Sequence, residues 1–343
     1  MTEPQPFIFD VHLDLSMNAM EWNRDLTQPL EKIRICEANQ TDKPDRSMGT
    51  VCLPEMRKGN VGLCVATQIA RYTKQKNPLP GWHSPAQAWA QSQGQLSWYN
   101  EVERQGELTQ ICNLEQLESH LEKWSTGQNK QLPIGYVLSL EGADSIITLQ
   151  HLESAYEKGL RAIGPAHYGP GTYAPGTGES GPLGNGATEL LREMECLNII
   201  LDVTHLSDTS LDQALDTFSG TVWASHCNCR TLVPGERQLN DHQLKRLIER
   251  GGVIGAALDA WMLIPDWQRG LTTPQSSGVK LSHVANHIDY VCQLAGNSKH
   301  ACIGTDLDGG FGLEQSPGDM ESIADLQKLP SILGKRGYST DDI

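Results

Sequence analysis

Seven side chains that can bind a metal ion or carry a proton directly follow short, apolar, β-branched runs of the sequence. In chain order they are His12, Asp14, Glu141, His167, His205, His226 and Asp306. Imidazole and carboxylate are the usual non-thiol ligands of zinc and similar divalent ions. One such residue alone would be explained as a capping or solvated polar group, but a set of seven is rarely coincidental. We therefore interpret the set as a metal centre.

The first two of these residues are separated by a single position. On an extended segment, this spacing places His12 and Asp14 on one side, where both can bind the same ion. Three histidines and two carboxylates exceed what one catalytic zinc requires while a position stays open. Two metals about 3.5–4 Å apart, sharing one carboxylate, can hold a bridging hydroxide and clamp a carbonyl group. The sequence thus predicts two Zn²⁺ or similar divalent ions and a hydrolytic reaction.

The apolar runs alternate with helical patterns along the chain. We expect strands at residues 7–11, 61–69, 134–140, 160–166, 199–204, 221–225, 252–257 and 301–305, and helices at residues 85–104, 149–158, 187–197, 208–218, 241–250, 284–295 and 320–333. Eight alternating strands predict an α/β fold with a parallel sheet, which at this length closes into a (β/α)8 TIM-type barrel. A doubly wound open sheet is the competing architecture, but no G-x-G-x-x-G follows the first strand. In a barrel, the metal site lies at the C-terminal ends of the strands.

Composition excludes several classes of protein. The 343 residues carry 27 Lys+Arg and 42 Asp+Glu, a net charge of −15. That charge argues against nucleic acid or an anionic membrane surface as a partner. No apolar run reaches the roughly 20 residues of a membrane span, and the N-terminus lacks the basic region of a secretory signal. The nine scattered cysteines contain no C-x-x-C. We therefore expect reduced thiols and a cytoplasmic location.

We find no internal repeat and no linker, so one hydrolase domain is expected over residues 1–343. Residues 72–83 and the Gly/Pro-rich residues 169–186 are interpreted as loops. The second loop has no Gly-Lys-Ser/Thr and is not a phosphate loop; a mobile loop over a site and a plain surface loop both remain open. Residues 338–343 resemble a helix N-cap and first turn, which suggests that a C-terminal helix is missing.

Three weaker signals have simpler interpretations. His283 and His287 lie four residues apart, but the Glu of H-E-x-x-H is absent, which favours a solvated helix face. Cys227 and Cys229 flank His226 in sequence, and we expect small buried packing residues there. Asp202 either orients a ligand imidazole or caps the turn that follows it.

The chain resembles the renal (membrane) dipeptidase family of zinc peptidases, within the amidohydrolase-like metal-dependent barrels. The matching segments occur in family order and span nearly the whole chain: DVHLDL, GNVGLCVATQ, SLEGAD, AHY, LREMECLNIILDVTHLSD, ASHCNCR, RQLND and IGTDLDGG. The resemblance implies that His12 and Asp14 bind one zinc, that His205 and His226 bind the other, and that Glu141 bridges the pair.

The resemblance also implies roles for three residues that contact the substrate. His167 matches the imidazole at the substrate carbonyl oxygen, and Asp306 matches the residue at the amino group, where it can also carry the proton. Arg237 matches the arginine that holds the substrate carboxylate, a task suited to a planar guanidinium. Arg230 matches a different family position.

The chain departs from the family pattern at two places. Leu13 stands where asparagine is usual, and Ala166-His167-Tyr168 replaces Thr-His-Asn. The metal ligands are unaffected, but these changes border the substrate. The resemblance implies a metallo-dipeptidase that tolerates a D-residue at the C-terminal position, with a small dipeptide as partner and pairing into a homodimer. The alternatives are an amidohydrolase of a non-peptide amide, lactam or N-acyl amino acid, and a non-catalytic metal-barrel binding protein.

Overall fold

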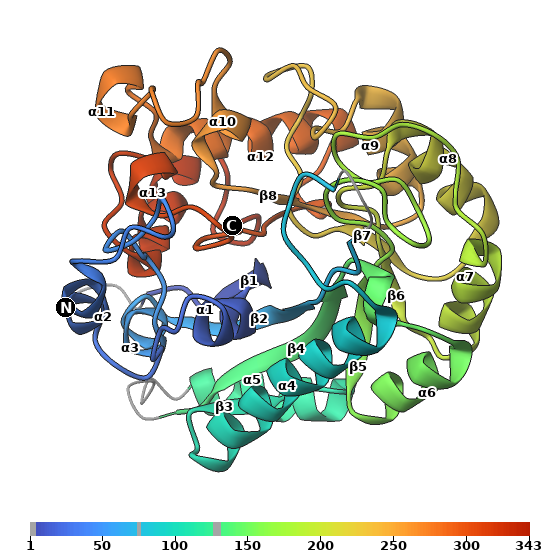
Figure 1. Ribbon diagram of the computed structural model, residues 1–343. Coiled ribbons are helices and arrows are strands. Elements are labelled where there is room, and N and C mark those ends of the chain that lie inside the picture. The colour runs from blue at the N-terminus through green and yellow to red at the C-terminus, as the bar shows by residue number, and fades with distance from the viewer. Residues whose placement is uncertain (1–4, 74–76, 126–131) are drawn as a thin grey trace.

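Eight parallel strands close into a barrel in the computed structural model, which describes residues 5–73, 77–125 and 132–343 (Figure 1). The barrel strands are β1 (Ile8–Leu13), β2 (Val61–Ile69), β4 (Ile134–Glu141), β5 (Leu160–Gly164), β6 (Ile200–Asp202), β7 (Val222–Ala224), β8 (Val253–Ala256) and β9 (Ala301–Ile303). They pair in this order, and β9 returns to β1 through Asp10 and Ile303. The predicted (β/α)8 barrel is confirmed, and every predicted strand is present with ends within two residues of the prediction.

One further strand was not predicted. β3 (Leu108–Gln110) pairs with residues 134–136 at the beginning of β4, whereas β5 pairs with β4 only from Leu138 onward. β3 therefore extends the sheet where β5 does not reach. Its three residues are too few to show an alternating pattern in the sequence.

Helices surround the barrel strands (Figure 1). They are α1 (Leu15–Met20), α2 (Leu30–Glu37), α3 (Leu53–Lys58), α4 (Pro85–Arg104), α5 (Leu114–Ser125), α6 (Leu149–Glu157), α7 (Ala187–Cys196), α8 (Asp208–Thr217), α9 (Asp241–Glu249), α10 (Ala260–Leu263), α11 (Pro274–Ser277), α12 (Leu281–Ala295) and α13 (Leu329–Gly334), with 3₁₀ turns η2 (Ala143–Ser145), η3 (Leu313–Gln315) and η4 (Ile323–Lys328). The local sequence explains why the first residues of α4 and α9 were predicted correctly. Ser84 caps α4 just before Pro85, and Asn240 forms a capping box with Gln243 at α9.

The single helix predicted over residues 320–333 is wrong. The chain forms the 3₁₀ turn η4 and then α13, in which Pro330 occupies the first turn. Proline lacks the amide hydrogen that an uninterrupted α-helix needs there, and its ring disfavours helical backbone in the residue before it. Among the described residues, no helix combines the length and apolar character needed to cross a membrane.

Close strand packing brings the C-terminal ends of β7, β8 and β9 together. A Cβ atom on Gly255 would lie 1.8 Å from the carbonyl oxygen of Ser225, and one on Gly304 would lie 1.7 Å from the same atom. Only glycine fits at both positions. The segment after Ser225 can therefore lie against both neighbouring strands, which places His226 beside the ends of β8 and β9.

Candidate metal centre

The predicted ligands meet at the C-terminal end of the barrel. His12 lies in β1 and Asp14 just after it, while Glu141 is the last residue of β4. His205 and His226 follow β6 and β7 by three and two residues. Parallel strands of a barrel end on the same face, so their first loop residues converge there.

Glu141 lies at the centre of this group. Its Oε1 is 3.1 Å from Nε2 of His205, 3.2 Å from Nε2 of His226 and 3.7 Å from Nε2 of His12. Nε2 of His12 is also 3.8 Å from Oδ1 of Asp14. Glu141 with His205 and His226, and His12 with Asp14 and Glu141, each place their ligand atoms within 4.8 Å of one another. Glu141 belongs to both groups, so its carboxylate has the position of a bridging ligand.

The side chains present fit a pair of divalent cations. Nε2 of His12 is buried and has no hydrogen-bond partner in the described part of the chain. The Nε2 atoms of His205 and His226 lie 3.2 Å apart and converge on the same carboxylate oxygen. A cation can bind these nitrogens together with the carboxylate on which they converge.

Burial sets the charge state of this centre. It lowers the pKa of His12 to about 3, and Arg237 adds to the effect; burial also holds the pKa values of His205 and His226 well below the usual range. The imidazoles are therefore neutral, which is the form that binds a metal. Burial, together with the charges of Asp14 and Asp306, raises the pKa of Glu141 well above its usual value. A bound cation would offset this crowding of carboxylates.

A third group contains Asp306. Its ligand atom lies within 4.8 Å of those of His12 and His226, and its Oδ1 is 3.8 Å from Nε2 of His12. Both Asp306 (φ 57°) and His205 (φ 68°) adopt the left-handed backbone that non-glycine residues rarely occupy. Such strain costs about 1–3 kcal/mol per residue and persists only where surrounding contacts hold it, as at functional sites.

Hydroxyl groups orient the ligand imidazoles from behind. Thr177 Oγ1 lies 2.8 Å from Nδ1 of His205, and Ser225 Oγ lies 2.8 Å from Nδ1 of His226 and 3.3 Å from Nδ1 of His12. Thr67 donates a hydrogen bond to Oδ1 of Asp14. These contacts engage Nδ1 and direct Nε2 of each ring toward Glu141.

Thr177 belongs to the Gly/Pro-rich loop at residues 169–186. The amide of Thr177 donates to the carbonyl of His167 at 2.9 Å, and a Cβ on Gly176 would lie 1.7 Å from that carbonyl oxygen. Tyr173 is buried, and its hydroxyl donates to the carbonyl of Ile146 at 2.6 Å. The loop therefore packs against the site, and the interpretation as a plain surface loop is wrong. Of the other predicted loop, residues 74–76 lie outside the described residues, and Tyr72 bridges to Trp82.

Replacing Thr177 with valine is expected to weaken metal binding about 10–100-fold, the usual cost of removing a group that orients a ligand. The substitution keeps the shape and removes only the hydroxyl beside His205. Thr172→Val is the matched control, because the Thr172 hydroxyl lies in the same loop and has no hydrogen-bond partner among the described residues. Competition with a chromogenic chelator measures both affinities. Equal affinities for the two variants would contradict the role of Thr177.

The predicted substrate residues border the same centre. Nε2 of His167 is 3.7 Å from Oε2 of Glu141, and its buried Nδ1 has no hydrogen-bond partner within the described ranges. Arg237 is buried; its Nη2 donates to the carbonyl of His226 at 3.0 Å and lies 3.3 Å from Nε2 of His205. Arg230 instead pairs with Asp208, at 2.7 and 2.8 Å. The structure thus places Arg237, and not Arg230, beside the ligands.

Sequence reasoning missed three residues near this site. Asp259 follows β8 by three residues and lies beside Asp306, because Leu258 donates to the carbonyl of Thr305 at 2.9 Å; burial raises the pKa of Asp259 to about 7. Arg71 follows β2 by two residues, and after burial its charge is the largest influence that lowers the pKa of His167. Both lie just after a barrel strand, in the position that the other site residues occupy, and neither was predicted.

Asp10 is the third residue that was missed. It is buried, and its carboxylate accepts hydrogen bonds from the amide of Thr305 at 2.9 Å, from the Thr305 hydroxyl at 2.6 Å and from the amide of His12 at 3.3 Å. It therefore joins β1 to the segment that follows β9, beside the ligand His12.

The structure explains the weaker signals of the sequence by the contacts that these residues make. Asp202 caps the turn, because its Oδ1 accepts from the amides of Thr204 at 3.0 Å and Ser225 at 3.1 Å. Cys227 and Cys229 are buried free thiols, as expected. The solvated helix face predicted for His287 is wrong. This side chain is 2% exposed, and its Nδ1 accepts from the amide of Cys229 at 3.1 Å.

His287 is expected to make stability depend on pH. Burial lowers its pKa from 6.5 to about 4, so between these values only the unfolded chain binds the proton. The stability from neutral His287 is present above pH 6.5 and is lost toward pH 4, by about 1.4 kcal/mol per pH unit. Urea unfolding of wild type and His287→Gln across this window should show a smaller pH dependence for the variant. The exposed His242→Gln should match wild type; an H287Q slope equal to that of wild type would contradict the assignment.

The fold and the donor set together describe a (β/α)8 barrel with a candidate metal centre at the C-terminal end of its strands. The model of the family described as membrane dipeptidase (peptidase family M19) matches residues 4–343. The chain therefore belongs to this family of peptide-bond hydrolases, and the resemblance seen in the sequence motifs is confirmed.

Two proteins related in sequence each match between half and two thirds of the chain. A protein from the pqqA 5′ region of Klebsiella pneumoniae is 29% identical over 195 residues, which are 54% of this chain and 68% of that protein. Dipeptidase tcpJ of Claviceps purpurea is 26% identical over 220 residues, 61% of this chain and 48% of the dipeptidase. The match thus spans about half of the fungal enzyme.

Solved structures share the fold over nearly the whole chain. A metallopeptidase from Rhodobacter sphaeroides, liganded with a phosphinate mimic of the dipeptide L-Ala-D-Ala, has a TM-score of 0.76 at 19% identity; the match covers 99% of this chain and 95% of that one. Dipeptidase AC, a metallopeptidase of the same family, has a TM-score of 0.77 at 20% identity, with 99% and 94% covered.

Proposed function

We propose that this chain is a two-zinc dipeptidase that cleaves dipeptides, including those with a D-residue at the C-terminal position. The observation that carries the proposal is the Glu141 carboxylate, which lies between two groups of buried ligand atoms. The buried Arg237 beside these ligands supports a substrate with a free carboxylate. The dipeptide mimic bound by the Rhodobacter neighbour supports the tolerance of a D-residue.

The ligands divide between two ions. His12 and Asp14 would hold one ion, His205 and His226 would hold the other, and Glu141 would contact both. Two zinc ions held in this way would supply the Lewis acidity that lowers the pKa of water and makes a hydroxide nucleophile available near neutral pH. Thr177 and Ser225 engage Nδ1 of His205 and His226, which leaves Nε2 of each ring for an ion.

The remaining residues bind the dipeptide and move its protons. Burial holds the pKa of His167 well below its usual range, so a neutral imidazole can donate a hydrogen bond to the oxygen of the attacked carbonyl. Arg237 would hold the terminal carboxylate with paired N–H groups. Asp306, whose pKa is raised well above its usual value by burial and then by Asp14, can keep a proton and deliver it to the leaving amine.

Hydrolysis by the zinc-loaded protein tests the proposal. The substrates are L,L- and L,D-dipeptides, the C-terminal amides of the same dipeptides, and N-acetyl amino acids, each with and without a chelator. The proposal expects chelator-sensitive cleavage of free dipeptides of both stereochemistries and much slower cleavage of the amides. Preferred cleavage of the N-acetyl amino acids or of the amides would favour the amidohydrolase alternative. Metal binding without any cleavage would favour a non-catalytic binding protein.

A further inference from the structure

We propose that Asn18, held in place by Arg24, is a positioning residue for the metal site. It fixes the backbone of Asp14 against the segment that carries Asp306. This inference rests on the proposed function, because it assigns Asp14 to a metal ion and Asp306 to proton transfer.

Asn18 joins two distant parts of the chain. It lies in α1 and is 3% exposed. Its Nδ2 donates to the carbonyl of Asp14 at 3.0 Å and to the carbonyl of Asp308 at 2.9 Å. Both amide hydrogens are therefore used, one on the residue that follows β1 and one on the loop after β9. This amide connects the residue expected to hold one ion with the loop expected to move the proton.

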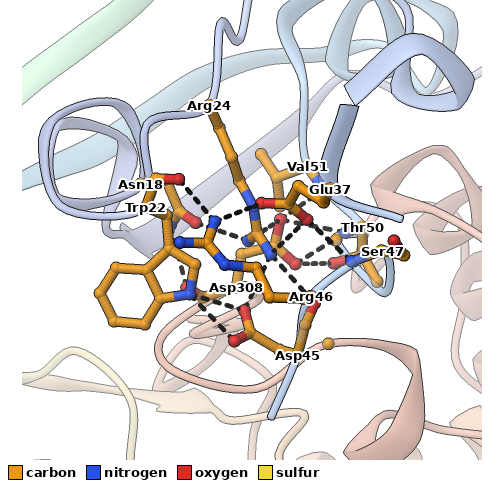
Figure 2. A network of polar contacts seen from close by, with 12 residues as sticks. Asn18, Trp22, Arg24, Glu37, Asp45, Arg46, Ser47, Thr50, Val51 and Asp308 are labelled. Atoms are coloured by element: carbon orange, nitrogen blue, oxygen red, sulfur yellow. Dashed lines mark hydrogen bonds and ion pairs between the residues drawn. The ribbon is translucent and has the colours of Figure 1, made fainter. Parts of the chain in front are cut away.

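Arg24 determines which way the Asn18 amide faces. Its Nη1 donates to Oδ1 of Asn18 at 2.8 Å (Figure 2). A reversed amide would turn its NH₂ group toward the guanidinium and its oxygen toward two carbonyl oxygens, so it would lose all three hydrogen bonds. A guanidinium cannot act as an acceptor, and this makes the observed orientation the only satisfied one.

Arg24 is itself fixed by buried carboxylates. Its Nε is 2.9 Å from Oε1 of Glu37, and its Nη2 is 2.9 Å from Oδ2 of Asp45. The guanidinium also lies 3.6 Å from Oδ2 of Asp308. The side chain of Arg24 is 1% exposed, so these charge-assisted contacts are shielded from water. They hold the guanidinium rigidly. Figure 2 shows Arg24 among these partners.

The loop after β9 requires such support. Asp306 (φ 57°) and Asp308 (φ 61°) both adopt left-handed backbone. The side chain of Asp308 accepts from the amide of Thr50 at 2.7 Å and from the amide of Val51 at 3.0 Å. Asn18 supplies the contact to the Asp308 carbonyl. Without it, the strained turn has one hydrogen bond fewer to oppose relaxation, and the carboxylate of Asp306 moves with the turn.

The same network contains a residue whose side chain donates to Asp45 and not to Asn18. Nε1 of Trp22 donates to both carboxylate oxygens of Asp45 at 2.9 Å. Its substitution by phenylalanine removes a buried hydrogen bond from the network but leaves the contacts of Asn18 in place. Trp22→Phe is therefore the matched control for loss of stability.

The test substitutes Asn18 and measures the metal site without relying on turnover. Asn18→Asp keeps an acceptor for Arg24 and removes both amide donors, while Asn18→Ser is too short to reach the two carbonyls and serves if the first variant does not fold. The readouts are the visible absorption spectrum of the Co²⁺-substituted protein, Co²⁺ affinity by chelator competition, the urea midpoint, and kcat and KM for an L,D-dipeptide.

We expect the cobalt spectrum to change in the Asn18 variants, the affinity to fall about 10–100-fold, and kcat to fall more than KM changes. Trp22→Phe should lower the urea midpoint but keep the wild-type spectrum and affinity. A wild-type spectrum and affinity in a folded Asn18 variant would overturn the inference, and so would an equal change in Trp22→Phe. If wild type bound cobalt but cleaved no dipeptide, the proposed function would fail while the cobalt readouts would still decide the role of Asn18.

Discussion

The Glu141→Gln variant is expected to lose at least about 10³-fold in kcat/KM for dipeptides, together with most of its bound metal. Oε1 of Glu141 approaches three ligand nitrogens, on His205, His226 and His12, at 3.1, 3.2 and 3.7 Å. Glutamine keeps the shape but removes the negative charge on which both groups of ligands depend. Elemental analysis of the purified variant and its steady-state kinetics are the measurements.

Glu103→Gln is the matched control. Glu103 contacts the opposite end of the barrel, where its carboxylate accepts from the amide of Gln110 at 2.8 Å, and glutamine can still accept there. The control should keep wild-type metal content and activity. A Glu141→Gln enzyme with full metal content and activity within tenfold of wild type would show that this carboxylate does not bridge the ions.

The second large effect is expected for Arg237→Ala, and its size should depend on the substrate. Leaving a substrate carboxylate without its buried cation costs about 2–5 kcal/mol, or roughly 30-fold to several thousand-fold in kcat/KM. A dipeptide amide has no such carboxylate and should lose much less. Arg237→Lys should recover only part of the loss, because an ammonium cannot make the paired contacts of a guanidinium. Kinetics with each dipeptide and its amide give this comparison.

Arg246→Ala serves as the control for this prediction. Arg246 makes its ion pairs with Asp212 and the exposed Asp216 of α8, so its loss should leave kcat/KM unchanged for both the dipeptide and its amide. Metal content must be measured in parallel, because Arg237 also contacts the carbonyl of His226. If Arg237→Ala slows the dipeptide and the amide equally at full metal content, its proposed role in carboxylate binding is wrong.

Much of the barrel could be predicted because each strand has a short apolar pattern of its own. β2, buried along its whole length, was predicted with its observed bounds. The segments that failed depend on contacts made elsewhere in the molecule. β3 exists because it pairs with the start of β4, and the break before α13 follows from Pro330, whose effect a helical pattern does not show.

The candidate site likewise contains residues that could be predicted from the sequence and residues that could not. The ligands could be predicted because a histidine or carboxylate at a strand end is a local signal, and the barrel then makes these ends converge. The groups behind them carry no such signal. Thr177 and Asn18 are ordinary polar residues in a loop and a short helix, and only the folded chain places them beside His205 and Asp14. His287 was misjudged because a helix face does not reveal what packs on it.

Metal titration of the stripped protein tests the central claim most directly. The protein is freed of metal with a chelator, Zn²⁺ is added in steps, and dipeptide hydrolysis is followed against the number of ions bound per chain. We predict that activity rises until about two equivalents are bound, as expected for a two-metal site, and that Glu141→Gln shows no such rise. Full activity at one equivalent would contradict the binuclear account, and activity without metal would contradict the metal centre itself.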